Sequence, residues 1–335
     1  MYPNEPKRIH LANLPTPIQK LEKLTALFDG PEIYIKRDDL TGVGLSGNKV
    51  RKLEYLLADA KEKEADTLIT CGGIQSNHAR ATAIAAAQND MSSVLVLRGE
   101  SERPYDGNVL LGRLVDAQIR LVTPEQYAER IDQIMEEVAG ELREQGRRPY
   151  VIPEGGSNSI GVWGYIRAGG EIRDQLEEMD LEVDVIVTAV GSGGTLAGLV
   201  VGRKLNNLKA RMVGFNVCDT AEHFQALIGR LVAETIKRYR LPVQVAEDEI
   251  ELINGYVGRG YALSRPEELA LIRQVAKAEG IFLDPVYTGK ALFGLADQIH
   301  QGRFKTGEKV LFLHTGGIYG LFTSEKRQGL FPGGS

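Results

Sequence analysis

Residues 183–190 restrict the fold more than any other part of the chain. They are almost all apolar, which is typical of a parallel strand that is covered on both faces. A glycine-rich turn at residues 191–195 and then a helix follow directly. The same order of strand, glycine-containing loop and helix recurs along the chain. This alternation predicts an α/β fold with two open, twisted, mainly parallel sheets flanked by helices.

Further elements are expected on both sides of this strand. Predicted strands occupy residues 32–37, 66–71, 93–97, 117–122, 149–153, 211–217 and 309–313, and predicted helices occupy about 49–63, 77–88, 125–145, 160–178, 222–240, 265–279 and 289–301. Apolar strands lie on both sides of a break near residues 155–164. We therefore expect two domains, a larger one formed by residues 1–50 and 166–335 and a small one formed by residues 51–165.

Composition and charge argue against several classes of protein. With a net charge of −5, the chain has no basic footprint for nucleic acid. Its first residues contain no apolar signal segment, and no later run approaches membrane-spanning length, so we expect a cytoplasmic protein with no membrane partner. Two cysteines and scattered histidines without paired spacing predict no metal site.

Loops rich in glycine and small polar residues follow several predicted strands. They comprise residues 41–48, 71–78, 191–195 and 314–317. In open parallel sheets, ligands bind beyond the carboxyl ends of the strands. We therefore expect these loops to converge on one site.

Lys49 stands at the end of the first of these loops and at the start of a helix. A charged lysine is unfavourable at the positive end of a helix, and burial lowers a lysine pKa, so we expect an uncharged amine. Residues 191–195 are typical of a phosphate-binding turn, in which backbone N–H groups at a helix start face an anion. A reactive amine with a separate phosphate-binding turn is what pyridoxal phosphate (PLP) requires.

Two nucleotide-binding motifs are near-misses in the same loops. A dinucleotide fingerprint beginning at Gly191 would need a third glycine where the chain has Leu196. A P-loop ending at Lys49 is interrupted by Asn48, and no Ser or Thr follows the lysine to hold magnesium. A nicotinamide-dependent oxidoreductase is therefore a remoter alternative, as is a PLP-binding protein without catalytic activity.

These loops and the segment at residues 283–290 contain motifs that are similar to those of a known enzyme family. These are Ser-Gly-Asn-Lys-Val-Arg-Lys-Leu-Glu at residues 46–54, Gln-Ser-Asn-His at 75–78, Leu-Asp-Pro-Val-Tyr-Thr-Gly-Lys at 283–290 and His-Thr-Gly-Gly at 314–317. With them the chain resembles the D-cysteine desulfhydrase / 1-aminocyclopropane-1-carboxylate (ACC) deaminase family, from about Leu14 to Phe322. The resemblance implies a PLP enzyme of the tryptophan-synthase-β fold type (fold type II), with PLP in the larger domain and a homodimer as the assembly.

The resemblance also implies a role for each matching residue. Lys49 would form the Schiff base with PLP and later move the α-proton of the substrate. The other implied PLP contacts are Asn77 at the ring hydroxyl, Gly191, Ser192, Gly193, Gly194 and Thr195 at the phosphate, and Thr288 or Thr315 at the pyridine nitrogen. The implied contacts of the small amino-acid substrate are Gln75, Ser76, Asn77, His78, Tyr261 and Tyr287. Of these, Ser76, Tyr261 and Tyr287 join Lys49 as catalytic residues.

Thr288 indicates which reaction of this family to expect. ACC deaminases resemble one another in carrying a glutamate here, which keeps the pyridine nitrogen protonated and makes the ring a deep electron sink. A threonine gives a weaker sink, which suffices when a thiolate leaves from Cβ. We therefore expect a PLP-dependent lyase, D-cysteine desulfhydrase, which forms pyruvate, ammonia and hydrogen sulfide by α,β-elimination. L-Cysteate sulfo-lyase and ACC deaminase are the alternatives.

Overall fold

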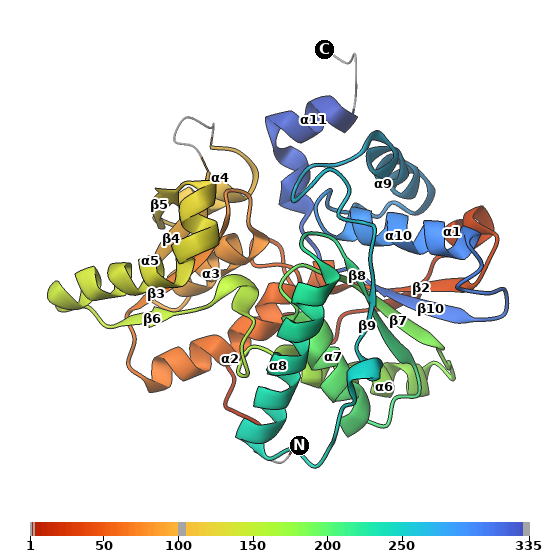
Figure 1. Cartoon of the computed structure of the whole chain (residues 1–335), viewed down its shortest axis with the longest axis horizontal. Helices are drawn as coiled ribbons and strands as arrows, with labels where there is room; N and C mark the ends of the chain where they lie inside the picture. Colours follow the sequence, from red (N-terminus) through yellow and green to blue (C-terminus); the bar gives the residue numbers. More distant parts are fainter. Residues whose placement is uncertain (1, 3, 100–104, 331–335) are drawn as a thin grey trace.

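Two sheets form the centre of the molecule, of which the computed structural model describes residues 2, 4–99 and 105–330 (Figure 1). The larger sheet has the order β1 (Ile18–Lys20), β2 (Glu32–Lys36), β10 (Lys309–Leu313), β7 (Val185–Val190), β8 (Arg211–Asn216) and β9 (Glu251–Ile253). The smaller has the order β5 (Gln118–Val122), β4 (Ser92–Arg98), β3 (Thr67–Gly73) and β6 (Pro149–Val151). Only β1 and β2 pair antiparallel among these strands, so the predicted pair of mainly parallel sheets is confirmed.

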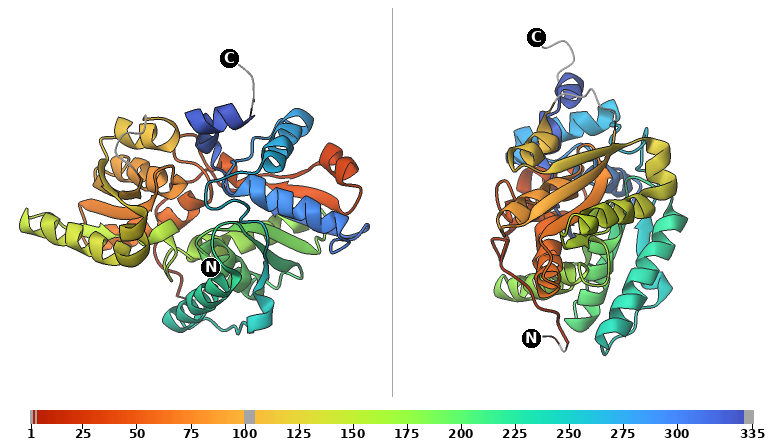
Figure 2. Two further views of the ribbon diagram at one scale, coloured as in Figure 1. Left: turned by 45° about the horizontal axis from the view of Figure 1, so that its top comes forward. Right: turned by 90° about the vertical axis from the view of Figure 1, so that its left-hand side faces the viewer.

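Helices pack on both faces of each sheet (Figures 1 and 2). They are α1 (Glu22–Phe28), α2 (Asn48–Glu62), α3 (Asn77–Ala87), α4 (Gly107–Leu114), α5 (Pro124–Glu144), α6 (Trp163–Glu178), α7 (Gly194–Leu205), α8 (Ala221–Tyr239), α9 (Pro266–Glu279), α10 (Thr288–His300) and α11 (Ser324–Leu330). Short 3-10 helices lie at η1 (Asp38–Leu40), η2 (Glu154–Gly156), η3 (Glu247–Glu249) and η4 (Ile318–Phe322).

Alternating side chains of the strands explain why both faces are covered. In β7, Val185 and Val187 belong to a buried cluster with α1, α9 and α10, whereas Ile186 and Val190 belong to the cluster with α6, α7 and α8. Successive side chains of a strand point to opposite faces, so an apolar run requires a helical layer on each side. The smaller sheet has the same arrangement, with α5 on one face and α3 and α4 on the other.

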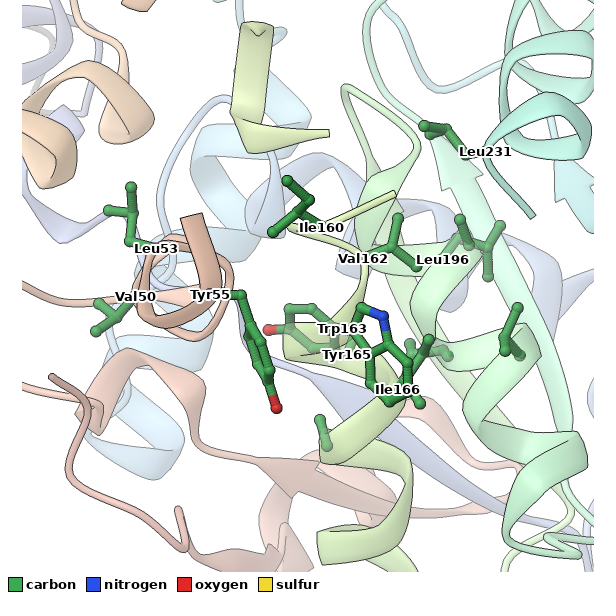
Figure 3. Close-up of a cluster of buried hydrophobic side chains, with 14 of the residues drawn as sticks. Val50, Leu53, Tyr55, Ile160, Val162, Trp163, Tyr165, Ile166, Leu196 and Leu231 are labelled. Atoms are coloured by element: carbon green, nitrogen blue, oxygen red, sulfur yellow. The ribbon is translucent and has the colours of Figure 1, made fainter. Parts of the chain in front are cut away.

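Trp163 lies in the middle of the largest buried cluster, which joins α2, α6, α7 and α8 (Figure 3). Its ring makes edge contacts with Tyr2 and Tyr239, at centroid distances of 6.1 and 5.2 Å, and a tilted contact with Tyr55 at 6.4 Å. Aromatic pairs of this geometry stabilise a core beyond the area that they bury. Because α2 carries Lys49, this cluster ties the first turn of that helix to the larger sheet.

The smaller sheet draws all its strands from residues 67–151, and the larger sheet draws its strands from both ends of the chain. The arrangement agrees with the proposed division into residues 51–165 and the remainder, although its boundaries stay a prediction. The helix expected over residues 160–178 begins later, at Trp163. The Asn158 side chain accepts hydrogen bonds from the N–H groups of Ile160 and Gly161, and these bonds hold the preceding segment in a turn.

Candidate active site

Lys49 lies in the first turn of α2 and faces a cavity between the two sheets, here named the lysine cavity. Its lining residues are Asn48, Lys49, Ser76, Asn77, His78, Glu154, Gly155, Ala189, Val190, Gly191, Ser192, Gly193, Thr195, Leu196, Tyr261, Tyr287 and Thr315. Gly47 precedes this helix with a φ of 90°, a backbone conformation that residues with a side chain rarely adopt. The glycine therefore allows the helix to start at this point. The loops predicted from the sequence to converge therefore do so.

The Lys49 amine is held in a buried setting that favours its uncharged form. Its Nζ atom lies 3.4 Å from the carbonyl oxygen of Gly155. Burial lowers the pKa of Lys49 to about 8, although the nearby Glu154 carboxylate opposes this shift. An amine with a pKa near 8 is available as a nucleophile and as a base at neutral pH, whereas an ordinary lysine is almost fully charged.

A buried charge network fixes α2 below the lysine cavity. Arg51 Nε donates to Asp38 at 2.8 Å, and its two terminal nitrogens donate to Glu171 at 2.9 and 2.8 Å. Burial alone would raise the pKa of Asp38, but the Arg51 guanidinium outweighs it and lowers that pKa to about 2. The Tyr165 hydroxyl donates to the same carboxylate. Since Arg51 follows Lys49 by two residues, the network orients the helix turn that presents the amine.

The turn between β7 and α7 forms the opposite wall of the cavity. Residues 191–193 lead into α7, so the first N–H groups of that helix have no partner within the helix and can face an anion. Thr195 Oγ1 accepts a hydrogen bond of 3.0 Å from Asn48 Nδ2, which links this turn directly to the residue before Lys49. Ser192 Oγ accepts another of 3.0 Å from Ser157.

Lys52 brings a second buried amine to this turn, and the sequence analysis gave it no role. It is fully buried, and its Nζ atom donates to the Gly155 carbonyl at 3.2 Å and to Ser157 Oγ at 3.1 Å. A Cβ atom on Gly194 would lie 2.8 Å from this amine, so the amine sits against the start of α7. Burial and the charge of Lys49 hold the pKa of Lys52 well below its usual value. No carboxylate pairs with Lys52 in the described part of the chain, so an anion bound here would stabilise the charged form of this buried amine.

The start of α3 forms a second place for an anion. Ser76 caps this helix and its Oγ atom accepts from the Ala79 N–H at 3.1 Å, which leaves the hydroxyl hydrogen free to donate. Asn77 Oδ1 accepts from Asn108 Nδ2 at 3.1 Å, so the Asn77 amide N–H₂ remains as a donor in the cavity. A carboxylate would therefore meet donors here as well as the positive end of the helix.

His78 is neutral and presents an acceptor. Thr70 Oγ1 donates to the Ile152 carbonyl at 2.9 Å and also lies 2.9 Å from His78 Nε2, so we assign the hydrogen to Nε2. Nδ1 then carries the lone pair, and it is buried without a hydrogen-bond partner among the described residues. Burial, together with the charges of Lys49 and Lys52, holds the pKa of His78 well below its usual value.

Two tyrosines complete the cavity. Their hydroxyl oxygens, on Tyr261 and Tyr287, are 2.8 Å apart. Burial raises the pKa of Tyr261 to about 12 and raises that of Tyr287 well above its usual value, so both are protonated at neutral pH. Asp284 fixes Tyr287, since its carboxylate accepts from the N–H groups of Val286, Tyr287 and Thr288. One hydroxyl must donate to the other, which leaves one O–H hydrogen for a reacting group.

Two of the predicted site residues, Gln75 and Thr288, do not line the lysine cavity. The Gln75 amide donates to Asp106 and accepts from the Asn108 N–H, so its side chain is not among those that line the lysine cavity. Thr288 Oγ1 donates to Asp284 at 2.7 Å, and its side chain is likewise outside the lining set. Thr315 does line the cavity, so of the two threonines it is the one that a molecule in this cavity can contact.

Several residues of the site were missed by the sequence analysis. The sequence analysis gave no role to Asn48, Lys52 and Asp284, although they stand in the family motifs, or to Glu154 and Gly155. Each of these residues acts through a partner distant in sequence or through local backbone contacts, which the sequence does not show. Lys52 could have been found only from its position one helical turn after Lys49, which places both amines on one face of α2.

Across the described residues, no group of His, Cys, Asp and Glu side chains could hold a metal ion, and no helix is long and apolar enough to cross a membrane. Burial raises the pKa of Cys71 to about 12, which makes its thiol unreactive at neutral pH.

A lysine of lowered pKa, opposite a helix start that can bind an anion and between two mainly parallel sheets, is the arrangement of a PLP-dependent enzyme. The donor set fits the cofactor, because the start of α7, Thr195 and Lys52 offer N–H, O–H and amine groups to a phosphate while Lys49 is free for an aldehyde. The sequence model of the pyridoxal-phosphate dependent enzyme family matches residues 9–316, and the chain belongs to that family.

Individual relatives show which members of this large family the chain is similar to. The chain is 45% identical over 321 residues to the mitochondrial bifunctional D-cysteine desulfhydrase/1-aminocyclopropane-1-carboxylate deaminase of Arabidopsis thaliana, covering 93% of this chain and 78% of the relative. It is 41% identical over 324 residues to the D-cysteine desulfhydrase of Klebsiella pneumoniae, covering 94% and 95%. The crystal structure of an ACC deaminase homologue superimposes with a TM-score of 0.86 at 43% identity, covering 96% of this chain and 94% of that one. The predicted tryptophan-synthase-β-like architecture and PLP dependence are thereby confirmed.

Proposed function

We propose that this enzyme carries out α,β-elimination on D-cysteine, forming pyruvate, ammonia and hydrogen sulfide. The observation that carries the proposal is the hydrogen-bonded pair of Tyr261 and Tyr287 in the cavity of Lys49, because a protonated hydroxyl there can protonate a leaving thiolate. The similarity to a protein named D-cysteine desulfhydrase supports the same substrate.

The residues that would hold PLP follow from the donors in the cavity. Bound PLP supplies an electron sink that is conjugated to the amino group of the substrate. The start of α7 together with Thr195 and Lys52 would hold the phosphate. The Asn77 amide would donate to the ring hydroxyl, and Thr315 would face the ring nitrogen.

The chain's own groups can then move the protons of the reaction. The Lys49 amine takes the α-proton of the substrate, while Ser76 and the start of α3 orient the carboxylate. The Cβ–S bond breaks with its electron pair on sulfur, and Tyr287 gives that sulfur a proton, with Tyr261 holding the hydroxyl in place. The released enamine takes up water and yields pyruvate and ammonia.

A side-by-side assay tests this proposal. The purified enzyme, supplied with PLP, is given D-cysteine, L-cysteate and ACC, and sulfide, sulfite and 2-oxobutyrate are measured. We expect sulfide and pyruvate from D-cysteine to dominate, and the Lys49→Ala variant to form none of the products while keeping its fold by circular dichroism. Dominant release of 2-oxobutyrate from ACC would replace the proposal with ACC deaminase, the second activity in the name of the Arabidopsis relative.

A homodimer in the cytoplasm is the remaining part of the proposal. Val43 is 85% exposed, and its carbonyl accepts from the hydroxyl of Tyr319 in η4; Phe322, in the same 3-10 helix, is half-exposed. Exposed apolar side chains on the loop of Val43 and on η4 suit a contact with a second copy of the chain. Sedimentation at the mass of one 36.7 kDa chain would contradict the dimer. Cell fractionation tests the location.

A further inference from the structure

A second cavity, here named the outer cavity, lies beside the lysine cavity and has a volume of about 650 Å³. Its walls come from both sides of the molecule: Arg98 and Asp106 belong to the small-sheet side, and Leu263 and Ser324 to the opposite side. Within the part of the chain that the structure describes, Tyr261 is the one residue that lines both cavities. Tyr261 therefore separates the outer cavity from the lysine cavity.

The backbone around Tyr261 is held firmly. Lys290 Nζ donates to the Gly260 carbonyl at 2.8 Å, and Lys326 Nζ donates to the carbonyl of the residue after Tyr261. A Cβ atom on Gly73 would lie 3.0 Å from the Tyr261 ring, so the ring packs closely against the end of β3. The ring thus lies at the boundary of the two cavities, with its hydroxyl on the side of Lys49.

Arg98, the last residue of β4, brings a positive charge to the outer cavity. Its guanidinium carbon lies 5.0 Å from the centroid of the Tyr261 ring and 5.1 Å from that of Tyr127. Stacking on aromatic rings uses the faces of the guanidinium and leaves its N–H edges for hydrogen bonds. Arg98 is half-buried, and none of the described carboxylates forms an ion pair with it.

The other charges of this cavity already have protein partners. Asp106 Oδ1 accepts from the Gln75 amide at 3.0 Å, and Oδ2 accepts from the Ser324 N–H at 2.9 Å. Lys326 donates to the protein as described above. Among the described residues, Arg98 is therefore the charged group of the outer cavity whose N–H donors are available to a bound molecule.

We propose that the outer cavity is an entrance chamber for small organic anions, in which Arg98 binds the carboxylate of the incoming amino acid before the substrate passes Tyr261. The passage to Lys49 rests on the proposed function, whereas the binding of anions to Arg98 does not. The bound class comprises carboxylates and sulfonates, since both present paired oxygens to the edge of a guanidinium.

Binding is tested first without turnover. Methanesulfonate and acetate are titrated into the PLP-loaded enzyme, and the broadening of their methyl NMR signals is measured for wild type, Arg98→Met and Arg113→Met. Arg113 is a matched control, because its guanidinium also stacks on a tyrosine, Tyr105, at 5.0 Å and it lines neither cavity. We expect weaker binding in Arg98→Met alone. Equal broadening in all three proteins would overturn the anion site, whatever the substrate of the enzyme is.

Steady-state kinetics then test whether the substrate reaches Lys49 by way of the outer cavity. With the amino acid that the enzyme converts fastest, Arg98→Met should lower kcat/KM about tenfold through KM, which is the usual scale for loss of one charged hydrogen bond. It should also flatten the decrease of kcat/KM with added salt, and Arg98→Lys should restore that salt dependence. If Arg98 merely supported Tyr261, kcat and the melting temperature would fall while the salt dependence and methanesulfonate binding stayed unchanged, and that result would overturn the proposal.

Discussion

Replacing Lys52 with Met should weaken PLP binding while leaving pyridoxal binding nearly unchanged. The two ligands differ only in the phosphate, and the Lys52 amine lies at the helix start that would receive it. Because Lys52 is fully buried, water does not screen this contact. A hydrogen bond to a charged group is worth about 1.5–3 kcal/mol, which corresponds to a loss of about 10- to 150-fold in PLP affinity. Methionine keeps the length and the apolar contacts of the lysine stem.

The measurement is a titration of cofactor-free enzyme with PLP and with pyridoxal, followed by the visible absorbance of the bound aldehyde. Lys61→Met is the matched control, since Lys61 lies on the exposed side of the same helix. Pyridoxal affinity should change less than about twofold in Lys52→Met. An equal loss for both ligands would show that Lys52 acts through Lys49 or through the fold, and an unchanged PLP affinity would refute the phosphate role outright.

Two further predictions concern pH. The amine of Lys49, with a pKa lowered to about 8, should take up PLP at a rate that rises between pH 7 and 8 and then levels off; a rise that continues to pH 10 would contradict the lowered pKa. The carboxyl of Asp38, with a pKa lowered from 3.8 to about 2, stabilises the folded state above pH 4, and this contribution, about 2 kcal/mol, is lost as pH falls to 2. Urea unfolding should therefore show Asp38→Asn to be less stable than wild type by about 3 kcal/mol at pH 7 and by a clearly smaller margin at pH 2; a constant margin would contradict the prediction.

The sequence predicted the fold wherever a segment carried its own pattern. The buried strand at β7 was found because its two covered faces require an apolar run, and α5 was found because its apolar residues follow a helical period. Edge strands β1 and β9, of three residues each, were missed because pairing with a neighbour, rather than composition, makes them strands. Helices α1, α4 and α11 were missed because seven or eight residues are too few for a clear period.

The site was predictable to the extent that its residues stand in recognisable loops. Lys49, Thr195, Tyr261 and Tyr287 were expected together, and they share one cavity. The direction of individual side chains was not predictable, because it depends on local competition for hydrogen bonds. Thr288 shows this, since the Asp284 carboxylate four residues earlier takes its hydroxyl.

Trp163 gives the enzyme a single optical reporter. It is the one tryptophan in the sequence, and its ring is fully buried among three tyrosines, so its emission should be blue-shifted and fed by energy transfer from those rings. The same cluster continues into α2, which carries Lys49, and into α7, whose start lines the lysine cavity. A cofactor that absorbs in the near ultraviolet and visible should quench this one emitter. Cofactor binding can therefore be followed in solution by tryptophan fluorescence without a label, in the wild-type chain and in each variant that retains Trp163.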